Sequence, residues 1–277
     1  MRNLRLAAGA AAVVSALVGI TAAMAADLPA RTYTKAPVYV EPAFNWSGFY
    51  VGGNIGYSWG RSENDGVISA VSTGAPLFFA TSRNDVNGVI GGGQFGYNWQ
   101  MSNWVVGLEA DFQGSGEKGS SLFICAACSP GGNITTDLTQ KLNWFGTVRG
   151  RAGILVTPTI LLYGTGGLAY GEIDTGGSLT GTNINFAPTS VLFPSVNSTQ
   201  VGWTAGAGVE GRIGGNWTMK LEYLFMDLGT VSGGPIASTI ASGRVTALGA
   251  SYSSHFTDNV VRVGFNYLFN APVVAKY

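Results

Sequence analysis

The sequence predicts an all-β protein, an eight-stranded antiparallel transmembrane β-barrel with short periplasmic turns and four long extracellular loops. The chain of 277 residues has a positive mean hydropathy, and only 11% of its residues are charged. Eight of its segments alternate between apolar and polar or small residues, as half-buried strands do. The connections between these segments are alternately short and long, which is the pattern of outer-membrane barrels with an even number of strands.

The charge composition excludes some classes of protein. Lys plus Arg and Asp plus Glu each number 15, so the chain has no basic excess with which to bind nucleic acid. A soluble domain carries about 25% charged residues. A disordered chain has more charge and fewer aromatic residues than this one. Both readings are therefore disfavoured.

The first 25 residues predict a cleaved signal peptide. Arg2 and Arg5 are followed by an apolar stretch to Ile20 and by an Ala-Met-Ala site, so we expect cleavage after Ala25. A retained membrane anchor is the alternative. No later apolar run approaches the 18 or more residues of a spanning helix. An exported chain of this kind is either a secreted β-protein or an outer-membrane barrel, since only closed barrels satisfy the backbone groups of strands in lipid.

Residues 26–45 contain Pro29, Pro37 and Pro42 and no apolar periodicity, so we expect a periplasmic linker there. We expect the barrel to span 46–269 and a short tail to follow at 270–277. The expected strands are 46–60, 86–100, 104–113, 138–155, 160–171, 200–213, 217–228 and 256–269.

The connections predict the topology. Tight turns rich in Gly, Asn, Ser and Pro are expected at 101–103, 156–159 and 214–216. Long polar loops are expected at 61–85, 114–137, 172–199 and 229–255. A secreted sandwich gives no reason for every second connection to be long.

Nine charged residues lie within the expected strands, each between apolar or glycine neighbours. They are Glu109, Asp111, Arg149, Arg151, Glu210, Arg212, Lys220, Glu222 and Arg262. Because successive side chains of a strand point to opposite faces, each strand has one charged and one apolar face. The rest of the charged face is mostly glycine and other small residues, which suits a narrow lumen. All seven Trp lie near strand ends, as in the aromatic belts of membrane barrels.

The charged face is therefore expected to line the barrel interior. There, neighbouring strands bring opposite signs together, 104–113 beside 138–155 and 200–213 beside 217–228. An eight-stranded barrel is just wide enough for side chains to fill it. A structural network of ion pairs is the main interpretation, and an ion path through the network is the alternative.

The two cysteines, Cys125 and Cys128, form a Cys-Ala-Ala-Cys segment in an expected loop. In an oxidising compartment we expect them to form a local disulfide. Free thiols are one alternative. Redox or metal chemistry is another, although a redox motif would require a βαβ setting and zinc would require two more ligands.

Several segments resemble one known family. Residues 46–60 (WSGFYVGGNIGYSWG), 143–153 (NWFGTVRGRAG), 162–171 (LYGTGGLAYG) and 221–229 (LEYLFMDLG) are similar to strands of the outer-membrane immunogenic proteins. This family is a branch of the OmpA-like eight-stranded barrels and porin-family proteins of α-proteobacteria. The resemblance implies a cell outer membrane location in a Gram-negative bacterium. It also implies a surface-antigen or envelope-stabilising role, with porin, haem-binding or host-interaction roles for some relatives.

The last expected strand resembles the C-terminal signal that the barrel assembly machinery reads, with Phe265, Tyr267 and Phe269 alternating. Tyr277 is the alternative terminus of this signal. Phe269 is favoured because the alternation ends there and Pro272 interrupts the tail.

We expect a structural or interaction protein that presents its loops from a rigid barrel. The expected partners are outer-membrane lipid and lipopolysaccharide, the assembly machinery and periplasmic chaperones, and a host or environmental ligand at the loops. A small porin-like channel or a ligand-binding protein is the alternative. A hydrolase is a remote one, because Ser253, Ser254, His255 and Asp258 lie on one short segment without an oxyanion hole. We assign no catalytic, cofactor-binding or metal-binding residue and expect no cofactor.

Overall fold

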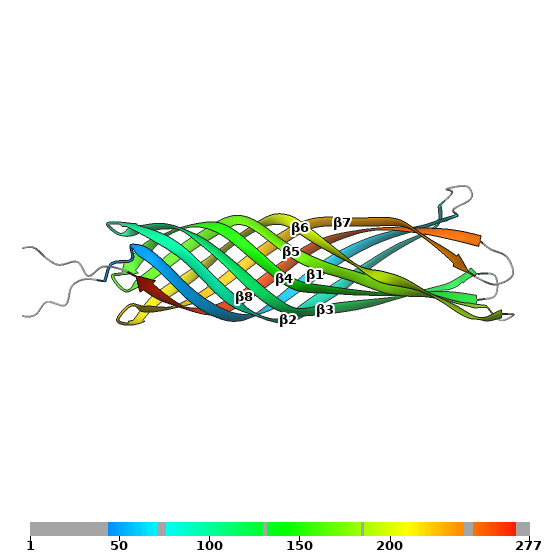
Figure 1. Ribbon diagram of the computed structural model, residues 1–277, viewed down its shortest axis with the longest axis horizontal. Helices are drawn as coiled ribbons and strands as arrows, with labels where there is room; N and C mark the ends of the chain where they lie inside the picture. Colours follow the sequence, from blue (N-terminus) through cyan, green and yellow to red (C-terminus); the bar gives the residue numbers. More distant parts are fainter. Residues whose placement is uncertain (1–43, 71–75, 130–131, 184–185, 241–245, 270–277) are drawn as a thin grey trace, which may run out of the picture. The chain divides into compact units, whose positions relative to one another are not determined.

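The protein is an all-β barrel of eight strands in consecutive order (Figure 1). The computed structural model describes residues 44–70, 76–129, 132–183, 186–240 and 246–269. The strands are β1 (Gly48–Ala70), β2 (Pro76–Met101), β3 (Trp104–Ser129), β4 (Gly132–Thr157), β5 (Ile160–Asn183), β6 (Phe186–Gly214), β7 (Trp217–Ile240) and β8 (Thr246–Phe269). Among these residues no helix is long and apolar enough to cross a membrane.

Every strand pairs antiparallel with its sequence neighbours, and β1 pairs with β8 from Phe49 and Phe269 onward to close the ring. The three predicted tight turns are confirmed between β2 and β3, β4 and β5, and β6 and β7. Two of them need the left-handed backbone region, at Ser102 (φ 56°) and Gly215 (φ 52°). By the rule for outer-membrane barrels, this short-turn end is periplasmic.

The strands extend well beyond the predicted ones, to between 23 and 29 residues. They occupy most of the four segments predicted as long loops, so those loop boundaries are wrong. The reason is visible in the β1–β2 hairpin, where Arg61 stands opposite Asp85 and Glu63 opposite Arg83. Complementary polar pairs keep these strands together outside the membrane, where no apolar alternation is needed.

Outward-facing aromatic residues form two belts. The periplasmic belt comprises Phe49, Tyr97, Trp99, Trp104, Trp217, Tyr267 and Phe269, and the second belt comprises Trp59, Phe112, Trp144, Tyr170, Trp203, Tyr223 and Phe225. We take the strand segments between the belts as membrane-spanning and call the strand segments beyond the second belt the extracellular extension. Six of the seven Trp lie in the belts as predicted. Trp46 does not, because its side chain is fully buried inside the barrel.

Candidate functional site: the barrel interior

The periplasmic mouth is closed by residues that precede β1. Trp46 packs with Val105, Leu161 and Tyr163. Its indole Nε1 donates to the carbonyl of Pro158 (3.2 Å), and its backbone N–H donates to Oε1 of Gln100 (2.8 Å). These bonds hold the indole across the mouth. Phe44, near the end of the predicted linker, packs against the same cluster and so belongs to the barrel, whereas 26–43 lie outside the described residues.

Eight of the nine predicted interior charges form one buried network above this mouth. They are Glu109, Asp111, Arg149, Arg151, Glu210, Lys220, Glu222 and Arg262, and none is more than 4% exposed. The ladder places Glu109 opposite Arg149, Glu210 opposite Lys220 and Glu222 opposite Arg262, which confirms the expected pairing of opposite signs. Four carboxylates thus face four cations.

Arg149 lies at the centre of the network. Its guanidinium contacts Glu109, Asp111 Oδ2 (2.9 Å) and Glu222 Oε1 (3.2 Å). From the opposite side of the lumen, Lys220 Nζ lies 2.8 Å from Glu109, and Arg262 lies 2.9 Å from Asp111 and 2.6 Å from Glu222. Because these contacts join β3 and β4 to β7 and β8, the network bridges the barrel from wall to wall.

Neutral side chains that the sequence analysis missed complete the network. The Tyr50 hydroxyl donates to Glu109 (2.7 Å), and the Tyr163 hydroxyl donates to Glu222 (2.9 Å). Thr218 and Asn266 donate to Glu210. All four have the inward parity of the charged residues, so parity could have identified them. Glycine makes the necessary room: a Cβ at Gly56 would lie 2.7 Å from Cβ of Arg262.

Arg212 was predicted to belong to the interior charge network, and this prediction is wrong. The structure places Arg212 at the periplasmic mouth, where its Nε donates to the carbonyl of Gly215 and its guanidinium lies over the ring of Phe44. The register explains this, because Arg212 lies two residues from the end of β6, below the level of Glu210.

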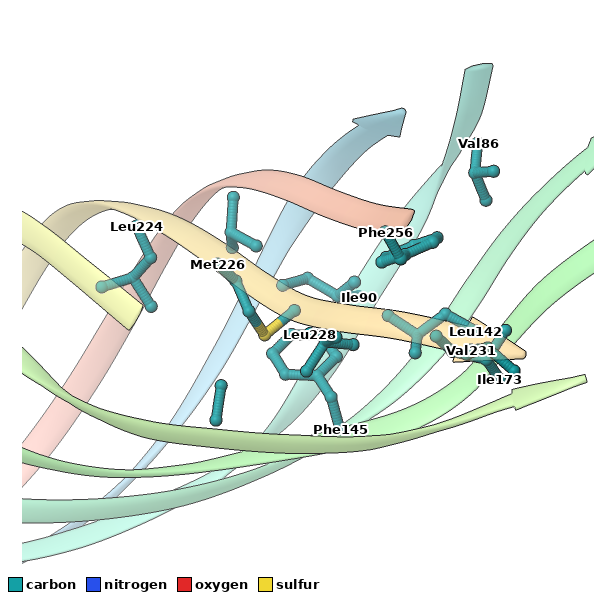
Figure 2. Close-up of a cluster of buried hydrophobic side chains, with 12 residues drawn as sticks. Val86, Ile90, Leu142, Phe145, Ile173, Leu224, Met226, Leu228, Val231 and Phe256 are labelled. Carbon is teal, nitrogen blue, oxygen red and sulfur yellow. The ribbon is translucent and has the colours of Figure 1, made fainter. Parts of the chain in front are cut away.

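An apolar layer fills the lumen beyond the ion network (Figure 2). It contains Leu224, Met226 and Leu228 of β7, with Phe145 of β4 and Phe256 of β8 among the side chains packed against them. On β7 the inward face changes from Lys220 and Glu222 to these apolar residues. This layer was not predicted from the sequence, although its β7 residues have the same inward parity as Lys220 and Glu222.

A pair of buried carboxylates lies above the network in the lumen, Glu117 in the extracellular extension of β3 and Asp258 beside the second belt on β8. Ser58 donates to Asp258 and interacts with Glu117. Gly88 stands opposite Ser58, and the missing side chain leaves room for Glu117. No ion pair joins either carboxylate to a cation within the ranges described. Burial first, and the Asp258 charge second, raise the pKa of Glu117 to about 9.

Glu117→Gln is expected to flatten the pH dependence of stability. The pKa of Glu117 is raised in the folded state, so the folded protein binds more protons than the unfolded chain between pH about 4.3 and about 9. The free energy of unfolding of the wild type therefore falls as the pH rises through this window, and glutamine removes that contribution. Urea unfolding in vesicles at several pH values measures it. Glu63→Gln, at an exposed residue of the extension, is the control; equal pH slopes for wild type and Glu117→Gln would contradict the assignment.

The hydrolase alternative depended on His255, whose side chain lies on the outside of the barrel wall. Its Nε2 lies 3.7 Å from Asp227 Oδ1, and its Nδ1 lies 3.2 Å from Thr230 Oγ1. Ser254 and Asp258 point into the lumen, since both are buried and have the opposite parity. The structure therefore does not bring His255 together with Ser254 and Asp258.

The remaining predicted residues lie on strands. Phe265 and Phe269 face outward at the periplasmic end of β8 with Tyr267 between them, as an alternating terminal signal requires. Cys125 and Cys128 belong to β3, but their side chains lie outside the described part of the structure. The disulfide stays a prediction, and so does the tail at 270–277.

A closed antiparallel ring with an apolar outer wall, two aromatic belts and a buried ionic interior defines an outer-membrane β-barrel. The comparisons with known proteins agree with this class. The family model "Outer membrane protein beta-barrel domain" matches residues 12–269. The chain belongs to this family and is an outer-membrane protein.

Two relatives are similar over most of their length. The 31 kDa outer-membrane immunogenic protein of Brucella melitensis biotype 1 is 36% identical over 260 residues, which cover 90% of this chain and 94% of the relative. The 22 kDa outer membrane protein of Rhizobium leguminosarum bv. viciae is 32% identical over 80% of this chain and 84% of its own. The resemblance to outer-membrane immunogenic proteins is confirmed, and these relatives support a surface or envelope role.

Solved structures similar to this chain include the outer membrane protein OprG from Pseudomonas aeruginosa. It is 14% identical, with a TM-score of 0.47, and the match covers 83% of this chain and all of OprG. The outer membrane protease OmpT from Escherichia coli is 12% identical, with a TM-score of 0.37, over 82% of this chain and 98% of OmpT.

Proposed function

We propose that the protein is a closed, non-conducting barrel that stabilises the envelope and presents its extracellular strands and loops as an interaction surface and antigen. The filled lumen supports this proposal most strongly. The Trp46 closure, the ion network, the apolar layer and the buried polar residues above them follow one another along the interior. The relatives named as immunogenic support the surface-antigen part.

The proposed role is non-catalytic. The separation of His255 from Ser254 and Asp258 on opposite faces of β8 supports this. The proposed partners are lipopolysaccharide around the outer wall, the assembly machinery and chaperones that read the β8 terminus, and a host or environmental ligand at the extracellular end.

Ion conductance tests the closed lumen. Purified protein, shown to be folded by its heat-dependent gel mobility, is added to planar lipid bilayers, with an open porin as the positive control. We expect no stepwise conductance, because the network bonds cross the lumen and leave no continuous water path. Reproducible conductance steps that increase in number with the amount of folded protein would contradict the proposal.

A further inference from the structure

Two lysines face each other on the outer wall beyond the second belt. Lys118 of β3 stands directly opposite Lys141 of β4 in the ladder. Both side chains are exposed, while their neighbours Glu117 and Leu142 are buried in the lumen. Directly opposite residues have Cβ atoms about 4.5–5.5 Å apart, and like charges in this arrangement are destabilising. The pair therefore has an electrostatic cost that an anion would remove.

The chain does not itself supply that anion. Within the described residues neither lysine has a hydrogen bond or an ion pair. The nearby exposed arginines do have partners: Arg61 lies 3.7 Å from Asp85, and Arg83 lies 3.1 Å from Glu63. Asp174 of β5 stands opposite Lys141 without an ion pair to it. Asp174, Lys141 and Lys118 therefore form a row across β5, β4 and β3 with one carboxylate and two ammonium groups, which leaves an excess positive charge.

The position of the pair relative to the belt indicates what could approach it. Phe112 and Trp144 stack at 5.4 Å and mark the belt on β3 and β4. Lys141 lies three residues beyond Trp144, roughly 10 Å along the strand. The polar headgroups of the outer leaflet occupy the layer immediately outside the hydrocarbon core. In the outer leaflet these headgroups include phosphorylated sugars.

A cavity of about 260 Å³ lies beside Lys141, on the side of β4 away from Lys118. Its lining includes Lys141, Thr139, Asp174 and Ser195. Oδ1 of Asp174 is buried and accepts no hydrogen bond. A phosphate alone would be repelled by this carboxylate. A phosphorylated sugar matches both features, since its phosphate oxygens accept from lysine and its hydroxyls donate to Asp174.

We propose that Lys118, Lys141 and the adjoining cavity bind the phosphorylated sugar headgroup of an outer-leaflet glycolipid. The lysines neutralise the phosphate, and Thr139, Asp174 and Ser195 meet the sugar hydroxyls. The site rests on the orientation used in the proposed function, in which the extracellular extension lies on the outer side of the membrane. It does not depend on a closed lumen, so its failure and a conducting barrel are separate results.

Binding of purified glycolipid to the full-length folded protein in detergent tests the site. The probes are phosphorylated lipid A and the same lipid after enzymatic removal of its phosphates, and native mass spectrometry counts the bound molecules. Lys118→Gln/Lys141→Gln is compared with Arg61→Gln, an exposed cation that already has a carboxylate partner. We expect the double variant to bind phosphorylated lipid A about tenfold more weakly, as the loss of two exposed charge contacts implies.

Binding of the dephosphorylated lipid is expected to be equal in all three proteins, and Arg61→Gln is expected to match the wild type with both probes. Heat-dependent gel mobility confirms that each variant is folded. Unchanged binding of phosphorylated lipid A by the double variant would overturn the proposal. An equal loss in Arg61→Gln would also overturn it, since any surface cation would then suffice. Displacement of the lipid by inorganic phosphate at equal concentration would overturn the assignment to a headgroup.

Discussion

Replacing Arg149 by leucine is expected to lower the free energy of unfolding by about 3–5 kcal/mol, the cost of breaking a buried ion pair. The variant loses contacts to Glu109, Asp111 and Glu222 at once. Four buried carboxylates then face three cations, in a lumen from which water is largely excluded. Urea unfolding in phospholipid vesicles, followed by tryptophan fluorescence and by heat-dependent gel mobility, measures the loss.

Two further variants make this prediction specific. Arg61→Leu removes an exposed cation whose partner Asp85 is also exposed, and its effect is expected to stay within about 1 kcal/mol. Arg149→Leu/Glu109→Leu removes one charge of each sign and is expected to recover part of the lost stability. If the free energy of unfolding of Arg149→Leu lies within about 1 kcal/mol of the wild-type value, the network does not stabilise the barrel in the way described.

An arginine on the membrane face is the second change with a large expected effect. Leu108 is exposed on the outer wall of β3 between the two belts. Leu108→Arg is expected to cost about 2–4 kcal/mol, because the charge would lie in the hydrocarbon core. The same urea titration in vesicles measures the cost.

Ser120→Arg is the matched control, since Ser120 has the same outward parity on β3 but lies in the extracellular extension. It is expected to change stability by less than about 0.5 kcal/mol, as surface substitutions usually do. Equal effects of the two arginines would mean that the belts do not mark the membrane boundaries.

The sequence predicts the barrel and most of the network because period-two charge, small residues on the same face and Trp at strand ends agree on one arrangement. Glu109, Arg149 and Glu222 each lie between apolar or small neighbours, so parity assigns all of them to the same wall. Their pairing then follows from antiparallel neighbours and short turns. The eight strands themselves are predicted from period-two alternation, which 46–60, 86–100 and 160–171 show without any of these charges.

The features that the sequence did not predict lack such a pattern. Trp46 is an exception: in the expected strand 46–60 it has the lumen parity of Gly52 and Asn54, but its place at a strand end favoured an aromatic belt instead.

The outer wall of the extracellular extension mixes charged residues such as Arg61 and Lys118 with apolar ones such as Phe79. It therefore shows no sustained apolar alternation and resembles loops in composition. The carboxylate pair requires two residues 141 positions apart, Glu117 and Asp258, to meet across three strand interfaces.

Cysteine scanning of β5 with nitroxide labels, in a Cys125→Ser/Cys128→Ser background, tests most directly which face contacts lipid. Access to lipid-soluble oxygen is expected to alternate along 162–169, with maxima at the exposed positions Leu162, Gly164, Gly166 and Leu168 and minima between them. A water-soluble nickel reagent is expected to reach none of these four positions. Access of the nickel reagent to those four positions would show that the apolar wall faces water, and would contradict the account.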